Sequence, residues 1–128
     1  MFKVKVVTPQ GLYRVLETSI LNVRTTDGQR GILTNHVPLV TMLTIGEMST
    51  IEDGQRYEYA LSGGMLYFKD NLATILTDAI ERSDEIDLER AEEAKRRAQE
   101  RISSKGEIDI LRAEVALRKA INRISVAK

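Results

Sequence analysis

Residues 80–91 read Ile80-Glu81-Arg82-Ser83-Asp84-Glu85-Ile86-Asp87-Leu88-Glu89-Arg90-Ala91, and the spacing of the apolar residues changes within this stretch. Upstream, apolar residues recur at every second position, as in a half-buried strand, whereas downstream they follow the spacing of one helix face. The charge density also changes, because residues 1–82 carry 8 basic and 9 acidic side chains and residues 83–128 carry 11 and 10. The sequence therefore predicts a β domain over residues 1–82 and a helical domain over residues 83–128.

The alternation is clearest at the start of the chain, where Phe2, Val4 and Val6 fall on one face of a strand and Lys3 and Lys5 on the other. Turn signals then follow at short intervals: Pro9-Gln10-Gly11, Asp27-Gly28, Gly46, Asp53-Gly54, Gly63-Gly64 and Asp70-Asn71. The runs between them are rich in β-branched and aromatic residues. About eight to ten short antiparallel strands are expected, folded into a small sandwich or barrel.

The helical domain is predicted to be a hairpin of two antiparallel helices. Apolar stripes define the helices, with Leu88, Ala91, Ala94, Ala98 and Ile102 in the first and Ile110, Ala113, Leu117, Ala120, Ile121 and Ile124 in the second. The first helix is expected to start at Ile86 behind a cap at Ser83 or Asp84, and the second at about Asp109. The predicted loop between them is Ser103-Ser104-Lys105-Gly106.

This hairpin is too small to be stable alone, since its 46 residues and alanine-rich seam bury little apolar surface. We expect it to dock on the β domain or on another protein. An element with two possible docking surfaces is a candidate conformational switch.

Several classes of function are excluded by composition. The 19 Lys and Arg residues balance the 19 Asp and Glu residues, so the chain lacks the basic excess of a nucleic-acid-binding protein. There is no cysteine for a disulfide, a thiolate metal site or a nucleophile. No segment approaches about twenty apolar residues, so direct membrane insertion is not expected and any membrane association should run through a partner.

Catalytic and metal-binding motifs are also missing from the sequence. His36 is the single histidine, and it has no cluster of further ligands or paired carboxylates around it. The glycine-rich stretches at residues 28–31 and 63–64 lack the Lys-Ser or Lys-Thr of a phosphate-binding loop that opens a helix. No catalytic residue, no metal site and no required cofactor is therefore predicted.

The charged helices carry a more informative pattern. Ile86-Asp87-Leu88-Glu89-Arg90-Ala91 recurs as Ile108-Asp109-Ile110-Leu111-Arg112-Ala113. One interpretation is two helix starts, each with an acidic first turn and an Asp to Arg pair. The other is an anion site, because Arg90 and Arg97 share one helix face, as do Lys119 and Arg123, and the four cations would converge on a triphosphate if the helices lie side by side.

These motifs together resemble the epsilon subunit of the bacterial F-type rotary ATP synthase across the whole chain. The resemblance is carried by Val6-Val7-Thr8-Pro9, by residues 27–39 (DGQRGILTNHVPL), by Ala60-Leu61-Ser62-Gly63-Gly64, by the Ile-Asp-x-x-Arg-Ala helix start, and by residues 116–123 (ALRKAINR). It implies a ten-stranded antiparallel β-sandwich followed by an antiparallel two-helix hairpin.

The resemblance also implies a role and partners. The chain would be a non-catalytic rotor subunit that couples proton flow to rotation and contacts the gamma subunit and the ring of c subunits. It would lie peripherally on the cytoplasmic face of the bacterial cell membrane. The segment facing these rotor partners would include Gly28, Gln29, Arg30, Gly31, His36 and Pro38.

In relatives the hairpin folds onto the sandwich or extends into the alpha/beta catalytic hexamer, where it inhibits ATP hydrolysis, and some relatives bind ATP in the folded form. By resemblance, Glu81, Ile86, Asp87 and Ala91 would lie near the nucleoside, and Arg90, Arg97, Lys119 and Arg123 near the phosphates. Lys119 departs from the arginine of the well-matched ATP binders. Because lysine lacks the bidentate fork of arginine, weaker ATP binding is expected.

Two alternatives to a regulatory rotor subunit stay open. A free-standing ATP-binding module would bind nucleotide without belonging to a membrane ATPase. A purely structural adapter would keep its helices on the sandwich permanently, and its truncation after residue 82 would leave ATPase inhibition unchanged.

Overall fold

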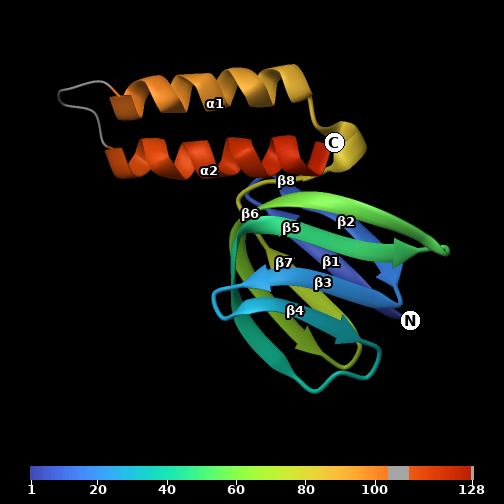
Figure 1. The fold of residues 1–128 in the computed structure, drawn as a ribbon. Coiled ribbons are helices and arrows are strands. Elements are labelled where there is room, and N and C mark those ends of the chain that lie inside the picture. The colour runs from blue at the N-terminus through green and yellow to red at the C-terminus, as the bar shows by residue number, and fades with distance from the viewer. Residues whose placement is uncertain (104–109, 128) are drawn as a thin grey trace.

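The computed structural model describes residues 1–103 and 110–127. Within these ranges strands come first and helices last (Figure 1). The elements are β1 (Phe2–Thr8), β2 (Gly11–Thr18), β3 (Ile20–Thr25), β4 (Gly28–Leu33), β5 (Leu39–Glu52), β6 (Gln55–Lys69), β7 (Leu72–Leu76), β8 (Ile80–Arg82), the 3-10 helix η1 (Ser83–Glu85), α1 (Leu88–Ser103) and α2 (Ile110–Ala127).

The strands follow the order β2-β1-β7-β6-β5-β3-β4, and β8 adds to β6. Most neighbours are antiparallel, as expected, and the β1–β7 pair is parallel. β1 therefore pairs in opposite senses on its two edges, antiparallel with β2 and parallel with β7.

The described residues form eight strands, where the resemblance implies ten. Two of them, β5 and β6, are unusually long, with 14 and 15 residues. Their mutual pairing passes over Thr44 and Gly63, and both strands curve there from one part of the sandwich to the other (Figure 1). Each long strand therefore takes the place of two shorter strands in the expected count of ten. The sandwich fold itself is confirmed.

The bend of β6 depends on Gly64. Its φ angle of 126° lies in the left-handed region, and a Cβ atom there would stand 1.9 Å from the carbonyl oxygen of Leu76. Only glycine allows β6 to turn this close to the end of β7.

A single apolar core fills the sandwich. It includes Phe2, Val4 and Val6, the strand face predicted from the alternation. The other buried core residues are Leu16, Leu21, Val23, Ile32, Leu43, Met48, Tyr59, Leu61, Leu66, Phe68, Ala73, Ile75 and Ile80.

The two helices pack side by side, and α2 lies between α1 and the sandwich (Figure 1). Four alanines from the predicted stripes, Ala91, Ala98, Ala113 and Ala120, are buried at 0–2 % exposure. Small side chains let the helix axes approach closely. The predicted loop at residues 103–106 and the predicted second start at Ile108 and Asp109 fall largely outside the described residues.

The start of α1 differs from the expectation. Ser83 and Asp84 belong to η1, and the cap is Asp87, whose Oδ1 accepts the Arg90 backbone N–H at 3.1 Å. Because the chain at Ile86 is extended, α1 begins at Leu88 and not at Ile86.

Candidate functional site

A groove of about 210 Å³ lies where α2 crosses β6 and β8. Three of the residues predicted for nucleotide binding line it: Glu81 on β8, and Lys119 and Arg123 on α2. The remaining lining residues are Ala60, Leu61, Ser62, Ala79, Ile80 and Asn122. The folded hairpin thus brings together residues from distant parts of the sequence.

An ion pair closes one side of this groove. Arg123 Nε lies 2.6 Å from Glu81 Oε1, and both side chains are about two-thirds shielded from solvent. The buried Nε faces this carboxylate, although its N–H is not aligned with the oxygen. A partly shielded guanidinium close to the ammonium of Lys119 suits an anionic ligand.

The residues predicted for nucleotide binding in α1 and just before it lie outside this groove. Arg90 is exposed on the first turn, and Arg97 is exposed and forms an ion pair with Glu93 at 3.3 Å. Ala91 is buried in the seam between the helices, and Ile86 is half-buried before the cap residue Asp87. None of these five residues lines the groove of Glu81, Lys119 and Arg123.

Asn122 is a residue that the sequence reasoning missed. Its Nδ2 donates to the carbonyl oxygens of Gly46 at 3.0 Å and Leu61 at 3.4 Å. The available signal was a polar residue between Ala120 and Ile124 on a helix face otherwise expected to be apolar.

A second groove, of about 290 Å³, runs along the other side of α2. Arg118 and Ser125 of α2 line it together with Arg24, Ile45, Gly46, Glu47, Ile121 and Asn122. Arg118 therefore faces away from Glu81, as its position next to Lys119 on the helix predicts.

The base of the hairpin is fixed to the sandwich by polar contacts. The Tyr13 hydroxyl donates to Glu85 of η1, and Glu85 Oε1 also accepts the Arg82 backbone N–H at 2.9 Å. Arg14 lies 3.9 Å from Glu85 and donates to the hydroxyl of buried Tyr59 at 3.4 Å. We call Tyr13, Arg14, Tyr59 and Glu85 the η1 anchor.

The phenols of the anchor are held in their protonated form. Burial, and then the hydrogen bond to Glu52, raise the pKa of Tyr59 to about 12. Burial and the Glu85 carboxylate likewise raise the pKa of Tyr13 well above its ordinary value. Both hydroxyls are therefore donors at neutral pH.

The residues predicted for the rotor interface lie on β4 and in the loop after it (Figure 1). Gly28, Gln29, Arg30 and Gly31 are all exposed, as is Pro38. His36 is half-buried, with its ring edge against Phe68 at 5.8 Å and its Nδ1 2.7 Å from the Val37 carbonyl oxygen.

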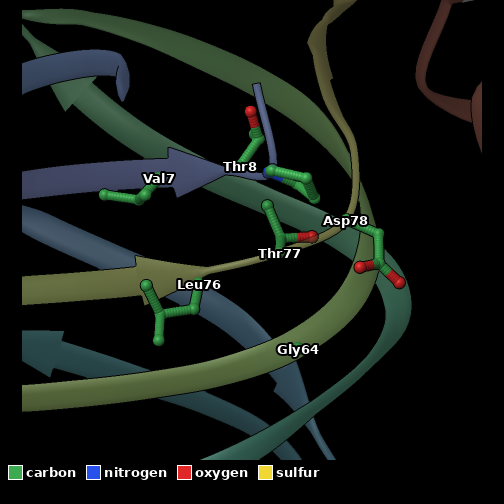
Figure 2. Close-up of a pocket in the computed structure, with 7 residues that line it drawn as sticks. Val7, Thr8, Gly64, Leu76, Thr77 and Asp78 are labelled. Carbon is green, nitrogen blue, oxygen red and sulfur yellow. The ribbon is translucent and has the colours of Figure 1, made fainter. Parts of the chain in front are cut away.

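One further hollow, of about 310 Å³, lies between the ends of β1 and β7 and the bend of β6 (Figure 2). It is mainly apolar and contains none of the predicted site residues; its lining is Val7, Thr8, Pro9, Gly64, Leu76, Thr77 and Asp78. Among the described residues there is also no group of three or more His, Asp or Glu side chains placed to hold a metal ion.

Two family models divide the chain between them. The model of the ATP synthase delta/epsilon chain β-sandwich domain matches residues 1–83, and that of the delta/epsilon chain long α-helix domain matches residues 84–128. The chain belongs to the ATP synthase delta/epsilon chain family. The resemblance inferred from the sequence motifs is thereby confirmed.

Curated relatives of this family include the ATP synthase epsilon chains of Pelotomaculum thermopropionicum and Lactobacillus helveticus. The first is 42% identical over 103 residues, which are 80% of this chain and 77% of the relative. The second is 46% identical over 106 residues, covering 80% of this chain and 73% of the relative. These names agree with the expectation of a subunit of an ATP synthase that is not itself an enzyme.

Solved structures of the same fold come from mitochondrial ATP synthases. A chain of the Euglena gracilis OSCP/F1/c-ring assembly matches with a TM-score of 0.79 at 23% identity, over 93% of this chain and 76% of that one. A chain of the Tetrahymena thermophila central stalk and c-ring matches with a TM-score of 0.59 at 15% identity, over 97% and 91%. At these identities the similarity supports the fold of the delta/epsilon family member described here.

No helix within residues 1–103 and 110–127 combines the length and the apolar character needed to cross a membrane.

Proposed function

We propose that this chain is a central-rotor subunit of a proton-translocating F-type ATP synthase and that its α1–α2 hairpin is a movable brake on ATP hydrolysis. ATP, as a regulatory ligand, would hold the brake in its folded, inactive position. The observation that carries this proposal is the groove of Glu81, Lys119 and Arg123, which exists only while α2 lies on the sandwich.

The groove has the chemistry of a phosphate site. Lys119 supplies an ammonium and Arg123 supplies a guanidinium. Phosphate oxygens are strong acceptors, so they would bind both cations. The carboxylate of Glu81 limits the positive charge of the site while no ligand is bound.

The two arginines of α1 would complete the phosphate contacts. Arg97 would exchange its ion pair with Glu93 for a phosphate, and because that pair is exposed the exchange costs little. Arg90 lies exposed on the first turn of α1, and Ile86, Asp87 and Ala91 next to it would contact the nucleoside.

ATP would act on the hairpin by linkage. A ligand that binds only the folded form stabilises it by RT ln(1 + [L]/Kd), or about 2.7 kcal/mol at a hundredfold excess over Kd. High ATP would therefore keep the hairpin folded, and low ATP would release it toward the alpha/beta catalytic hexamer.

The rotor part of the proposal assigns the gamma subunit and the c-ring as partners, at the cytoplasmic face of the bacterial membrane. It is supported by the family and by an apolar surface on neighbouring strands of the sandwich, where Val40, Met42, Tyr67 and Leu76 are 42–61 % exposed. A solitary small protein rarely exposes such a surface, whereas a subunit of a complex covers it. The loop with Gly28–Gly31, His36 and Pro38 would contact the ring and the foot of gamma.

Calorimetric titration of the purified chain with ATP tests the nucleotide part. Saturable binding is expected, with weaker binding in Arg123→Ala and tighter binding in Lys119→Arg, because arginine restores the bidentate fork. Arg118→Ala, on the opposite groove, is the matched control and should bind as the unmodified chain does. Absence of saturable binding at millimolar ATP would refute nucleotide sensing but leave the rotor role standing.

ATP hydrolysis by the assembled complex tests the brake. Truncation after residue 82 should raise hydrolysis if the hairpin inhibits. Unchanged hydrolysis would instead identify the chain as a structural adapter, and failure of the chain to purify with the membrane ATPase would favour a free-standing nucleotide-binding module.

A further inference from the structure

Asn122 occupies the centre of the surface that α2 places on the sandwich. It lines both grooves that flank the helix, the one with Glu81 and the one with Arg24. Its two hydrogen bonds, to the carbonyls of Gly46 and Leu61, join α2 to β5 and β6.

The two carbonyl groups belong to one place on the sandwich, because Gly46 of β5 lies directly opposite Leu61 of β6 in the register. Both residues are buried when α2 is docked. A carbonyl that loses water needs a donor in exchange, and Asn122 donates to both. When α2 leaves, water can take over this role, so the contact is reversible.

The apolar contacts of the hairpin do not define a single position for α2. Its fully buried residues are Ala113, Ala120 and Val126, and the two alanines lie in the seam with α1. That leaves Val126, near the end of α2, as the fully buried apolar side chain outside this seam among the described residues of the helix. A directional hydrogen bond to two fixed backbone oxygens does define the position.

The position of Asn122 decides what its neighbours face. Lys119 precedes it by three residues and Arg123 follows it by one, and both line the groove with Glu81. Arg118 and Ser125, four before and three after, line the opposite groove. A rotation of α2 about its axis would move Lys119 and Arg123 away from Glu81 and bring Arg118 round to β5.

We propose that Asn122 is a positioning residue that sets the rotation and axial position of α2 on the sandwich, and thereby brings Lys119 and Arg123 to Glu81. Its effect on docking stands on the contacts above alone. Its effect on ATP affinity rests on the proposed function.

The test measures docking and ATP binding separately. The chain contains no cysteine, so spin labels can be attached at Glu17→Cys on β2 and Glu114→Cys on α2, both exposed positions, and their distance distribution measured by electron paramagnetic resonance. Three substitutions are compared in this labelled background. Asn122→Asp keeps the shape but removes the donor, Asn122→Ser keeps a shorter donor, and Ser125→Ala is the matched control on the same helix.

One narrow distance is expected for the unsubstituted labelled chain and for Ser125→Ala. Asn122→Asp should broaden or shift the distribution, since its carboxylate repels both carbonyls, and Asn122→Ser should be intermediate. The thermal unfolding of the sandwich should not change. In calorimetry, Asn122→Asp should raise the dissociation constant for ATP about tenfold. This is the change expected if the two hydrogen bonds from Asn122 are lost and together contribute about a factor of ten to binding.

An unchanged narrow distribution in Asn122→Asp would overturn the proposal, and so would an equal broadening in Ser125→Ala. If Asn122→Asp lowers the unfolding temperature of the sandwich itself, Asn122→Ser repeats the comparison in a milder form, and the proposal fails if that variant lowers the temperature as well. If the unsubstituted chain does not bind ATP, the proposed nucleotide function fails while the distance measurement still decides the role of Asn122.

Discussion

Replacement of Tyr59 by phenylalanine should destabilise the sandwich and change its response to alkali. Tyr59 is fully buried, and its hydroxyl donates to Glu52 Oε2 at 2.8 Å and accepts from Arg14 at 3.4 Å. A hydrogen bond to a charged group contributes about 1.5–3 kcal/mol. Thr50 still donates to the same Glu52 oxygen at 2.5 Å, so this carboxylate keeps a partner and we expect the low end, about 1.5 kcal/mol.

The pH dependence follows from the raised pKa of Tyr59, about 12 in the folded chain against 10.0 ordinarily. A raised pKa means that the folded state holds the proton more tightly, so this stabilisation is complete below pH 10 and is lost as the pH rises through 12. The stability difference between the natural chain and Tyr59→Phe should therefore close between pH 10 and 12.

Urea unfolding followed by circular dichroism, at neutral pH and at steps toward pH 12, measures both effects. Tyr57→Phe is the matched control, because the Tyr57 hydroxyl donates only to exposed Gln55 at 3.2 Å. That control should change stability by less than about 0.5 kcal/mol. The reasoning is refuted if Tyr59→Phe matches the control at neutral pH, or if its deficit stays constant up to pH 12.

Three further substitutions test other parts of the fold. Gly64→Ala should abolish or severely reduce folding, because its Cβ would lie 1.9 Å from the Leu76 carbonyl oxygen. The control Gly54→Ala has open space at its Cβ and should cost only about 1 kcal/mol of backbone strain. The soluble yields and urea midpoints of the two variants are compared. Asp87→Ala should destabilise the start of α1 by about 1 kcal/mol, because the helix loses its cap. Amide exchange at residues 88–91 measures this loss, with Asp84→Ala as the control. Equal exchange in the two variants would contradict the assignment of Asp87 as the cap. Ala98→Leu should overpack the seam between the helices and destabilise the hairpin by about 1–3 kcal/mol. Amide exchange should then increase in α1 and α2 but not in the sandwich, whereas Gln99→Leu, at an exposed position, should leave exchange unchanged. Equal protection in the two variants would argue against a tight seam.

The sequence predicted those features that depend on local periodicity. The alternation of Phe2, Val4 and Val6 places these residues in the core, and the alanine spacing identifies the buried seam of the hairpin. Both patterns follow from which face of an element is turned toward apolar neighbours, so they can be read from consecutive residues.

Features that depend on distant parts of the chain were not predictable. The parallel pairing of β1 with β7 joins residues about seventy positions apart and leaves no local signal. The cap at Asp87 in place of Ser83 or Asp84 follows from the η1 anchor, which holds Glu85 to Tyr13 and so delays the helix. Ser83, Asp84 and Asp87 are all favourable cap residues by local propensity, and the contact between Tyr13 and Glu85 is what distinguishes them.

The candidate site shows the same division. Lys119 and Arg123 were singled out by their spacing on one helix face and Glu81 by resemblance, and the structure places the three in one groove. Asn122 was passed over because its role depends on the carbonyls of Gly46 and Leu61, which become neighbours of α2 only in the folded chain. A backbone acceptor leaves no trace in side-chain composition.

The long β5–β6 pair has a mechanical consequence. Leu39 at one end is opposite Phe68, which touches the His36 ring, and Gly46 further along is opposite Leu61, where α2 rests. The path between these places runs along two strands without crossing a turn. The hydrogen bonds of an antiparallel pair stand perpendicular to the strands, so a force along the pair loads many of them at once instead of opening them one by one. Each paired segment therefore resists shear, and the bend at Thr44 and Gly63, which lies between His36 and the contact with α2, is the point where the pair can flex.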